Sequence, residues 1–266
     1  MTRTAAPILM YHRVAARSSR RMRPFTVDPA AFEAQLAFLR REGYRGLTVS
    51  DLVARIGNGL ALPEKPVLLT FDDGFADFHA DAVPLLRKYG FPATLYMVAG
   101  EIGGSASWLP GADRHLRLLT SAELVELDGA GIEIGAHSMT HPALDLLAPA
   151  ALESEVRGSK ARLEEVLGHP VLSFCYPFGF ADGRVRAAAK AAGFASACSV
   201  RYRTFLTGDD PFDLPRHIVR GGAGLGEFAS IVGGHPAIAP MLWDRLRAGL
   251  GSAARHWAGQ TLARSK

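Results

Sequence analysis

Two acidic residues and two histidines occur in short motifs that could assemble a metal-dependent hydrolytic site. Asp72 and Asp73 stand in Thr-Phe-Asp-Asp-Gly directly after an apolar run. Adjacent carboxylates at the end of a buried strand are costly unless a cation satisfies them. His137 and His141 are four residues apart, so both imidazoles can converge on one ion. One aspartate and two histidines form a three-ligand set with open positions for water and substrate, and the second aspartate is left free to act as a base.

A third motif, Tyr176-Pro177-Phe178-Gly179, also follows an apolar run. Its proline and glycine predict a turn that would direct a backbone N–H at a developing oxyanion. Each motif also has an ordinary explanation, since Asp-Gly is typical of hairpin turns and histidine pairs arise by chance on surfaces. The residues after Gly74 do not alternate like a returning strand, however. Each motif follows a predicted strand, so we expect all three at one edge of a sheet.

The elements that must position these motifs alternate between strand and helix along the chain. Several apolar runs are continuous, as in strands that are covered on both faces. We predict strands at residues 8–12, 67–71, 93–98, 132–136, 171–176, 195–200 and 214–219. We predict helices at residues 29–41, 82–89, 121–130, 150–167 and 183–192. This alternation indicates a parallel α/β sheet, open or closed into a barrel, whose active site lies at the carboxyl ends of the strands.

Length and composition bound the class of protein. The chain has 266 residues, of which 48% are apolar and 21% charged, so it can bury a sizeable core and disorder over most of it is excluded. Two cysteines exclude a disulfide framework and a four-cysteine zinc site. The net charge of +4 permits an anionic surface or substrate without demanding one, and we expect no nucleic-acid partner. The arginines at positions 17, 20, 21 and 23 are interpreted as a solvated loop.

The C-terminal segment has a different character. Residues 241–266 place apolar side chains on one helical stripe with arginines around it. We therefore divide the chain into a catalytic domain, residues 1–235, and a basic amphipathic helical tail, residues 236–266. The tail either packs on the domain or touches an anionic membrane surface or a partner. No run approaches the ~20 apolar residues of a membrane span, and no export signal is visible, so the expected location is cytoplasmic, at the inner membrane face if the tail binds lipid.

The three motifs, in this order, make the chain resemble the polysaccharide deacetylase family, carbohydrate esterase family four, over roughly residues 7–219. The resemblance implies a distorted (β/α) barrel of about seven strands and metal-dependent removal of N- or O-acetyl groups from sugars. Matched by position, Asp72 resembles the catalytic base, and Asp73, His137 and His141 resemble the metal ligands. The backbone N–H of Phe178 resembles the oxyanion donor. We expect Zn²⁺, although this ligand set would also hold Co²⁺ or Ni²⁺.

Two departures from the family pattern lead to further expectations. Many members have an arginine at the position of Cys175 that pairs with the base, and here we expect Arg216 to reach Asp72 instead. Many members also supply the general acid from a C-terminal Leu-x-His segment, whereas one subgroup supplies it from an N-terminal Tyr-His motif. This chain has His12 in such a motif, and we expect His12 rather than His217 to be the acid.

Two aromatic residues are further candidates to support the site. Trp108 would line a sugar site by stacking on a ring, and Tyr176 belongs to the third motif. The two cysteines are expected to pack as small hydrophobic residues. The glycine-rich residues 221–226 superficially resemble a dinucleotide loop, but no following strand completes that unit, so we expect a flexible connection.

We expect the protein to remove acetyl groups, N-acetyl from N-acetylhexosamine units above all, from a polysaccharide or glycan precursor. Three alternatives stay open. The same aspartate and histidines could hold iron in an oxygenase, although such oxygenases generally have double-stranded β folds. A relative on the same fold could hydrolyse a small non-peptide amide. An inactive carbohydrate-binding module is the third alternative, and the intact set of four residues argues against it.

Overall fold

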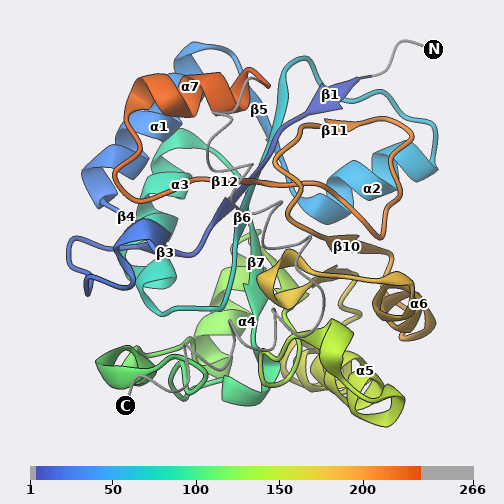
Figure 1. The fold of residues 1–266 in the computed structure, drawn as a ribbon. Coiled ribbons are helices and arrows are strands. Elements are labelled where there is room, and N and C mark those ends of the chain that lie inside the picture. Colours follow the sequence, from blue (N-terminus) through green and yellow to red (C-terminus); the bar gives the residue numbers. More distant parts are fainter. Residues whose placement is uncertain (1–3, 235–266) are drawn as a thin grey trace.

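A curved parallel sheet forms the centre of the computed structural model, which describes residues 4–234 (Figure 1). Its hydrogen-bonded order is β10-β9-β8-β7-β6-β2-β12, and β5 pairs with the first half of β6. All seven strands predicted from the apolar runs are present, and β5 was not predicted. The strands are β2 (Ile8–Tyr11), β5 (Arg45–Leu47), β6 (Pro66–Phe71), β7 (Thr94–Met97), β8 (Glu133–Ala136), β9 (Ser173–Cys175), β10 (Ser196–Cys198) and β12 (His217–Ile218).

Helices surround this sheet, with α1 and α3 on the left of Figure 1, α2 on the right and α5 and α6 at the lower right. The helices are α1 (Pro29–Arg41), α2 (Val49–Gly57), α3 (Val83–Tyr89), α4 (Ser121–Gly129), α5 (Pro149–Leu167), α6 (Gly183–Ala191) and α7 (Leu225–Val232). The predictions of α1, α3, α4, α5 and α6 are confirmed, whereas α2 and α7 were missed. Because α7 begins at Leu225, the flexible connection expected at residues 221–226 is wrong for its last two residues.

Local signals in the sequence set several helix ends. Asp28 caps α1 by accepting a hydrogen bond from the Ala30 N–H. Thr120 and Glu123 form the expected capping box at the start of α4. Gly168 ends α5 in the left-handed conformation that glycine adopts at little cost. These contacts are local, so the sequence predicted them from spacing alone.

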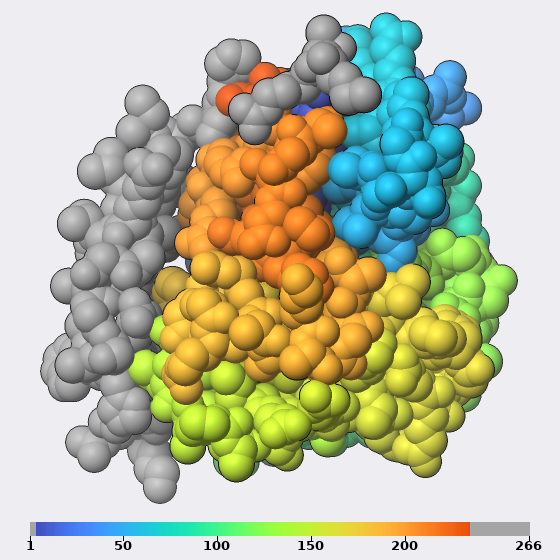
Figure 2. Space-filling model, turned by 90° about the vertical axis from the view of Figure 1, so that its right-hand side faces the viewer, coloured from blue at the N-terminus to red at the C-terminus, as the bar shows by residue number. Residues whose placement is uncertain are grey.

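The barrel closes through the residues that precede β12. A bridge joins Cys198 to Leu214, and the Leu214 N–H donates to the Ala197 carbonyl at 3.0 Å. Figure 2 views this side of the molecule, where the orange residues after β10 lie between the blue residues of α2 and the yellow residues around β9 and α6. One bridge in place of a full ladder makes the closure irregular. The predicted distorted (β/α) barrel of about seven strands is confirmed.

Shorter elements complete the fold. The antiparallel pair β1 (Ala5–Ala6) and β11 (Phe205–Leu206) contributes apolar side chains to the barrel interior, and β3 (Arg13–Val14) pairs with β4 (Thr26–Val27). Single helical turns occur at Arg23–Phe25, Ala99–Glu101, Gly111–His115, Leu144–Leu146 and Pro177–Gly179, and a wide turn, Phe78–Ala82, leads into α3.

Alternation along the strands separates two apolar cores and determines where the site lies. In β6, Leu69 and Phe71 pack with the helices, whereas Leu68 belongs to the core inside the barrel. Since side chains alternate between the two faces of a strand, the residue after Phe71 faces the barrel interior at its carboxyl end. That residue is Asp72.

The predicted tail, residues 236–266, lies outside the described residues, as does the proposed domain boundary at residue 235. Within residues 4–234, none of the helices is both long and apolar enough to cross a membrane. The cytoplasmic location and the contact of the tail with a membrane therefore stay predictions.

Candidate active site

The site residues follow the carboxyl ends of neighbouring parallel strands. The register pairs Tyr11 of β2 with Phe71 of β6, and the Asp72 N–H donates to the Tyr11 carbonyl at 2.9 Å. His12 and Asp72 are therefore the next residues of two adjacent strands. His137 follows β8, and its N–H donates to the carbonyl of Met97 at the end of β7 at 2.8 Å. The parallel register thus brings segments that are far apart in the sequence to one rim of the barrel.

Asp73, His137 and His141 form a group whose candidate ligand atoms all lie within 4.8 Å of one another. Asp73 Oδ1 lies 3.5 Å from His137 Nε2 and 3.4 Å from His141 Nε2. That oxygen is buried and has no hydrogen-bond partner among the described residues. Such an orphaned carboxylate oxygen facing two imidazole nitrogens suits a divalent cation, because a buried polar atom otherwise needs a partner.

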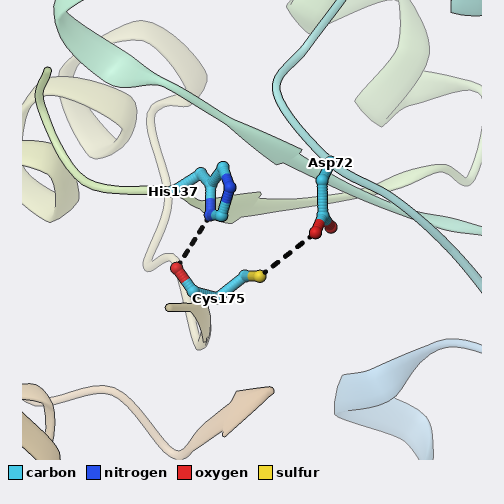
Figure 3. Close-up of side chains that lie close together, drawn as sticks. All are labelled: Asp72, His137 and Cys175. Atoms are coloured by element: carbon cyan, nitrogen blue, oxygen red, sulfur yellow. Dashed lines mark hydrogen bonds between the residues drawn. The ribbon is translucent and has the colours of Figure 1, made fainter. Parts of the chain in front are cut away.

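Hydrogen bonds behind these side chains orient them. His137 Nδ1 donates to the Cys175 carbonyl at 2.8 Å (Figure 3). This bond leaves Nε2 free to face Asp73. Burial by itself would raise the pKa of Asp73, but the imidazoles of His137 and His141 hold that pKa well below its usual value. Asp73 is therefore an anion, the form in which a carboxylate binds metal.

Backbone strain is concentrated at the site. Asp73, Ser138, His141 and Phe178 have φ of 78°, 63°, 62° and 60°, a region that side chains other than glycine rarely occupy. The His141 N–H donates to Ser138 Oγ at 3.0 Å, and this bond holds the turn between the two histidines. Residues in such conformations persist only where the surrounding structure enforces them, and they are enriched at functional sites.

Asp72, His137 and Cys175 form a second group with ligand-type atoms, drawn in Figure 3. The Cys175 thiol donates to Asp72 Oδ2 at 3.5 Å. Burial raises the pKa of this thiol well above its usual value, so it stays protonated and is a poor metal ligand. Both oxygens of Asp72 also accept hydrogen bonds from Arg216. The chemistry of the donors therefore favours the Asp73 group as the cation site.

Arg216 is fully buried and makes the expected contact with Asp72. Its Nη1 donates to Asp72 Oδ1 at 2.6 Å and its Nη2 to Asp72 Oδ2 at 2.7 Å, a bidentate pair. Nη1 also donates to Thr70 Oγ1 at 3.0 Å, and Nη2 to Cys175 Sγ at 2.9 Å. The guanidinium lies over the Tyr96 ring, 5.6 Å from its centroid. Burial would raise the pKa of Asp72, but the charge and hydrogen bonds of Arg216 lower it below its usual value.

The two candidate acids occupy different surroundings. Burial lowers the pKa of His12, and the nearby charges of Asp73 and Asp72 oppose that shift. His12 is therefore close enough to both aspartates to feel their charge. His217 is fully buried at the register position of Leu9, and burial lowers its pKa to about 4. Its Nε2 lies 3.3 Å from Thr204 Oγ1. Leu9 stands three residues before His12 in the sequence, so His217 lies deeper in the sheet than the rim.

Aromatic rings enclose His141. Trp108 stacks on the His141 ring with centroids 5.0 Å apart, and Phe178 meets it edge-on at 4.8 Å. Phe178 is 52% exposed, the one strongly exposed aromatic side chain in the described structure. Trp108 thus supports a candidate metal ligand directly, a contact that sequence analysis did not predict.

Tyr176 lies in the hydrophobic core and not beside the four site residues. Its side chain packs in the core between sheet and helices, and its hydroxyl donates to the Phe212 carbonyl at 3.0 Å. Strand alternation turns the Tyr176 side chain away from the barrel interior, toward which Cys175 points, and its supporting role stays a prediction. Trp108 thus contacts a candidate metal ligand, whereas Tyr176 packs in the core.

Sequence analysis also missed Glu155 of α5, which shapes the histidine loop. Its carboxylate accepts from the backbone N–H groups of Met139 and Thr140 at 2.8 and 2.9 Å and from Thr140 Oγ1 at 2.6 Å. No local signal could have identified it, because the contact joins a loop to a helix packed beside it.

With this geometry in place, the comparisons with known proteins identify the family. Residues 60–197, more than half of the chain, match the family model described as polysaccharide deacetylase. The chain therefore belongs to the polysaccharide deacetylase family, and the predicted family is confirmed. The matched range includes Asp72, Asp73, His137 and His141 but neither His12 nor Arg216, so the roles of those two residues and the Tyr-His subgroup stay predictions.

Individual relatives agree with this assignment. The family member YxkH of Bacillus subtilis (strain 168) is 32% identical over 188 residues, which cover 71% of this chain and 62% of that protein. The chain thus spans less than two thirds of the length of this relative. A poly-β-1,6-N-acetyl-D-glucosamine N-deacetylase of Staphylococcus aureus (strain MRSA252) is 22% identical over 211 residues, covering 76% of this chain and 70% of that protein.

A solved structure shows the shared fold. The Streptococcus pyogenes deacetylase PplD, in complex with acetate, superposes with a TM-score of 0.76 at 24% identity. The superposition covers 87% of this chain and 99% of that chain. The barrel described here is therefore the deacetylase fold.

Proposed function

We propose that this protein is a metal-dependent hydrolase that removes N-acetyl groups from N-acetylhexosamine units of a polysaccharide or glycan precursor. The observation that carries the proposal is the division of two adjacent aspartates. Arg216 binds both carboxylate oxygens of Asp72. Asp73 instead presents to two imidazoles a buried oxygen that has no hydrogen-bond partner among residues 4–234. Family membership and the named substrate of the Staphylococcus aureus relative support the choice of an acetylated amino sugar.

In this proposal Asp73, His137 and His141 hold a divalent cation, for which we expect Zn²⁺. When bound there, the cation would polarise the acetyl carbonyl and make a water at the same place more acidic. Zinc suits a set of one carboxylate and two imidazoles, and cobalt or nickel would fit the same donors.

The side chains around this position divide the proton transfers. Asp72, ionised at neutral pH because of Arg216, accepts a proton from the attacking water as the new C–O bond forms. The Phe178 N–H donates to the oxygen that gains negative charge. His12 gives a proton to the departing amine as the C–N bond breaks. The products are acetate and a free amino sugar. Asp72 then loses its proton to water and His12 regains one, which restores the starting protonation states.

The competing chemistries are less consistent with these observations. An iron oxygenase on this triad is generally built on a double-stranded β fold, whereas the described sheet is parallel and surrounded by helices. A hydrolase of small amides shares the fold, so the substrate screen must separate that alternative.

The test measures acetate release from chitooligosaccharides and poly-N-acetylglucosamine and ring opening of a cyclic ureide, with Zn²⁺ added after chelation. We expect one acetate for each new free amine and no oxygen consumption. Asp72→Asn should lower turnover by about 10²–10⁴-fold, the usual contribution of a general base, with bound zinc unchanged. Asp73→Asn should lose the zinc. Hydrolysis of the ureide alone, or loss of zinc from Asp72→Asn, would contradict the proposal.

A further inference from the structure

Two loops form one wall of the candidate site and contact each other. The first rim loop, residues 15–25, begins three residues after His12 and returns to it, with the Phe25 and His12 rings 5.0 Å apart. The second rim loop, residues 99–118, carries Trp108, which stacks on His141. Ser19 Oγ of the first loop donates to Asp113 Oδ2 of the second at 3.0 Å. Both loops are therefore fixed against the site instead of lying elsewhere on the surface.

The first rim loop is strongly basic and its charge is not neutralised nearby. The loop contains no acidic residue. Four of its residues are exposed arginines, namely Arg17, Arg20, Arg21 and Arg23. None of them forms an ion pair with a residue in the described range 4–234. Arg114, next to the contact point on the second loop, is exposed and equally unpaired within that range.

The acidic residues of the second rim loop are already engaged. Asp113 is buried and accepts from Ser19, and Glu101 accepts from Ser107. Arg117 of the same loop forms an ion pair with Glu123 of α4. The two loops together carry six arginines against the two carboxylates of Glu101 and Asp113, and this excess of positive charge makes the local field positive.

The wall also lacks the apolar groups that a lipid surface would require. In the described part of the chain, the large hydrophobic side chains that are exposed are Leu60, Val125, Leu172, Phe178 and Leu225, and none lies in either rim loop. Met22 is buried and Phe25 packs on the core. Interfacial membrane binding generally combines basic charge with buried apolar area, so charge alone fits a hydrated polyanion better.

We propose that this arginine wall binds carboxylates of uronic acid residues that flank the acetylated sugar, so that the preferred substrate is an acidic acetylated glycan. The inference rests on the proposed function, because the site beside the wall must accept an acetylated sugar. Guanidinium groups match carboxylates in a bidentate manner. The arginines are spread over seven residues of one loop, which suits charges that recur along a glycan chain better than one compact anion.

The experiment compares binding of two oligosaccharides of equal length in the zinc-loaded Asp72→Asn protein, which should retain acetyl groups on both ligands. One is N-acetylheparosan, which alternates glucuronate with N-acetylglucosamine, and the other is the neutral chitooligosaccharide. We expect the acidic ligand to bind at least tenfold more tightly at low salt, with the preference shrinking as NaCl rises. The triple variant Arg17→Gln/Arg20→Gln/Arg21→Gln should reduce that preference at least tenfold.

A matched control removes the same charge elsewhere. Arg40, Arg45 and Arg87 are exposed on α1, β5 and α3 and form no ion pair in the described range, and their triple glutamine variant should keep the preference. An equal loss in both triple variants would show general attraction by net charge and overturn the inference. Equal affinity of the Asp72→Asn protein with all its arginines for both glycans would overturn it too.

Two further ligands separate other polyanions from the glycan. These ligands are vesicles of phosphatidylglycerol and a short DNA duplex. If either binds more tightly than N-acetylheparosan and depends on the same three arginines, it replaces the acidic glycan as partner and refutes the inference. The acetate-release screen stays separate from these measurements. Failure of that screen with an intact acidic preference would reject the proposed activity and leave the binding surface.

Discussion

At the scale of single residues, the site depends on how two neighbouring carboxylates are given different surroundings. Asp72 continues the alternation of β6 and faces the barrel interior, where Arg216 binds both its oxygens. Regular alternation would turn Asp73 to the opposite face. Its φ of 78° breaks that alternation, and its carboxylate faces the two histidines instead. A strained backbone at one residue therefore separates a base from a metal ligand.

A first prediction concerns the acidic limb of the pH–rate profile. Because Arg216 lowers the pKa of Asp72, weakening that pair should raise the pKa, so that Asp72 becomes protonated at higher pH. We expect the acidic limb of kcat/KM to move to higher pH in Arg216→Lys and further in Arg216→Gln, with at least a tenfold loss at pH 7. Steady-state kinetics from pH 4 to 9 measures this.

Folding must be checked in these variants, since removing one partner of a buried ion pair typically costs about 3–5 kcal/mol. Circular dichroism and urea unfolding give that check. Arg201→Gln, which breaks the exposed pair with Asp213, is the matched control and should leave the limb in place. An unchanged acidic limb in folded Arg216→Lys and Arg216→Gln would show that Arg216 does not tune the base.

A second prediction separates the two histidines. His12→Ala should lower kcat/KM on amides by about 10²–10⁴-fold, because a general acid is lost. The loss should be smaller on an aryl acetate, whose leaving group needs no proton. His217→Ala should mainly lower stability, because this residue is buried away from the rim with a pKa of about 4. Near-wild-type amide turnover by His12→Ala would contradict the assignment.

At the scale of elements, close packing between β7 and β8 supports the floor of the site. The Tyr96 ring lies across Gly135, where an added Cβ would come within 2.5 Å of a ring carbon. Tyr96 in turn lies beneath the Arg216 guanidinium, and its hydroxyl bonds Ser173 Oγ at 2.6 Å. A glycine on one strand is thus required for the position of an arginine that comes from another.

A third prediction follows from this packing. Gly135→Ala should destabilise the protein by about 1–3 kcal/mol, because overpacking forces neighbouring side chains from their positions. Gly183→Ala is the control, since an added Cβ there would meet no described atom within 4 Å apart from its chain neighbours and the backbone of its own helix. Its stability should change by less than about 0.5 kcal/mol. Urea unfolding measures both, and equal stabilities would contradict the packing argument.

At the scale of the whole molecule, the candidate ligands come from two separate segments, the ends of β6 and β8, so cation binding should report on the folded barrel. A ligand that binds only the folded state stabilises it by about 2.7 kcal/mol at a concentration of one hundred times Kd. This linkage gives a readout that does not depend on turnover.

A fourth prediction uses that linkage. Zn²⁺ added to chelated protein should raise Tm, and EDTA should reverse the shift. Asp73→Asn and His141→Ala should abolish the shift, whereas Asp72→Asn should keep it. His169→Ala, which alters an exposed histidine paired with Asp128, controls for adventitious binding and should also keep it. A full shift in Asp73→Asn would remove Asp73 from the ligand set. Calorimetry measures all five proteins.

Much of the fold and the motifs of the site could be predicted from the sequence, because those features are local. The continuous apolar runs predicted the strands of the barrel, and Asp28 and Thr120 predicted helix starts through contacts within one turn. The short strand β5 and helix α2 were missed, since a three-residue strand carries little periodic signal. The aspartate and histidine motifs were visible because their residues are neighbours in the chain.

Only the tertiary structure decided which distant residues meet at the rim. Arg216 reaches Asp72 because the barrel closes through the residues before β12, and Trp108 reaches His141 because a loop after β7 folds over the rim. Ser19 and Asp113 join two loops that are 94 residues apart. Such contacts depend on sheet order, register and the path of each loop, and a linear pattern does not encode them. The sequence by itself therefore determined the chemical groups, and the closed barrel determined their partners.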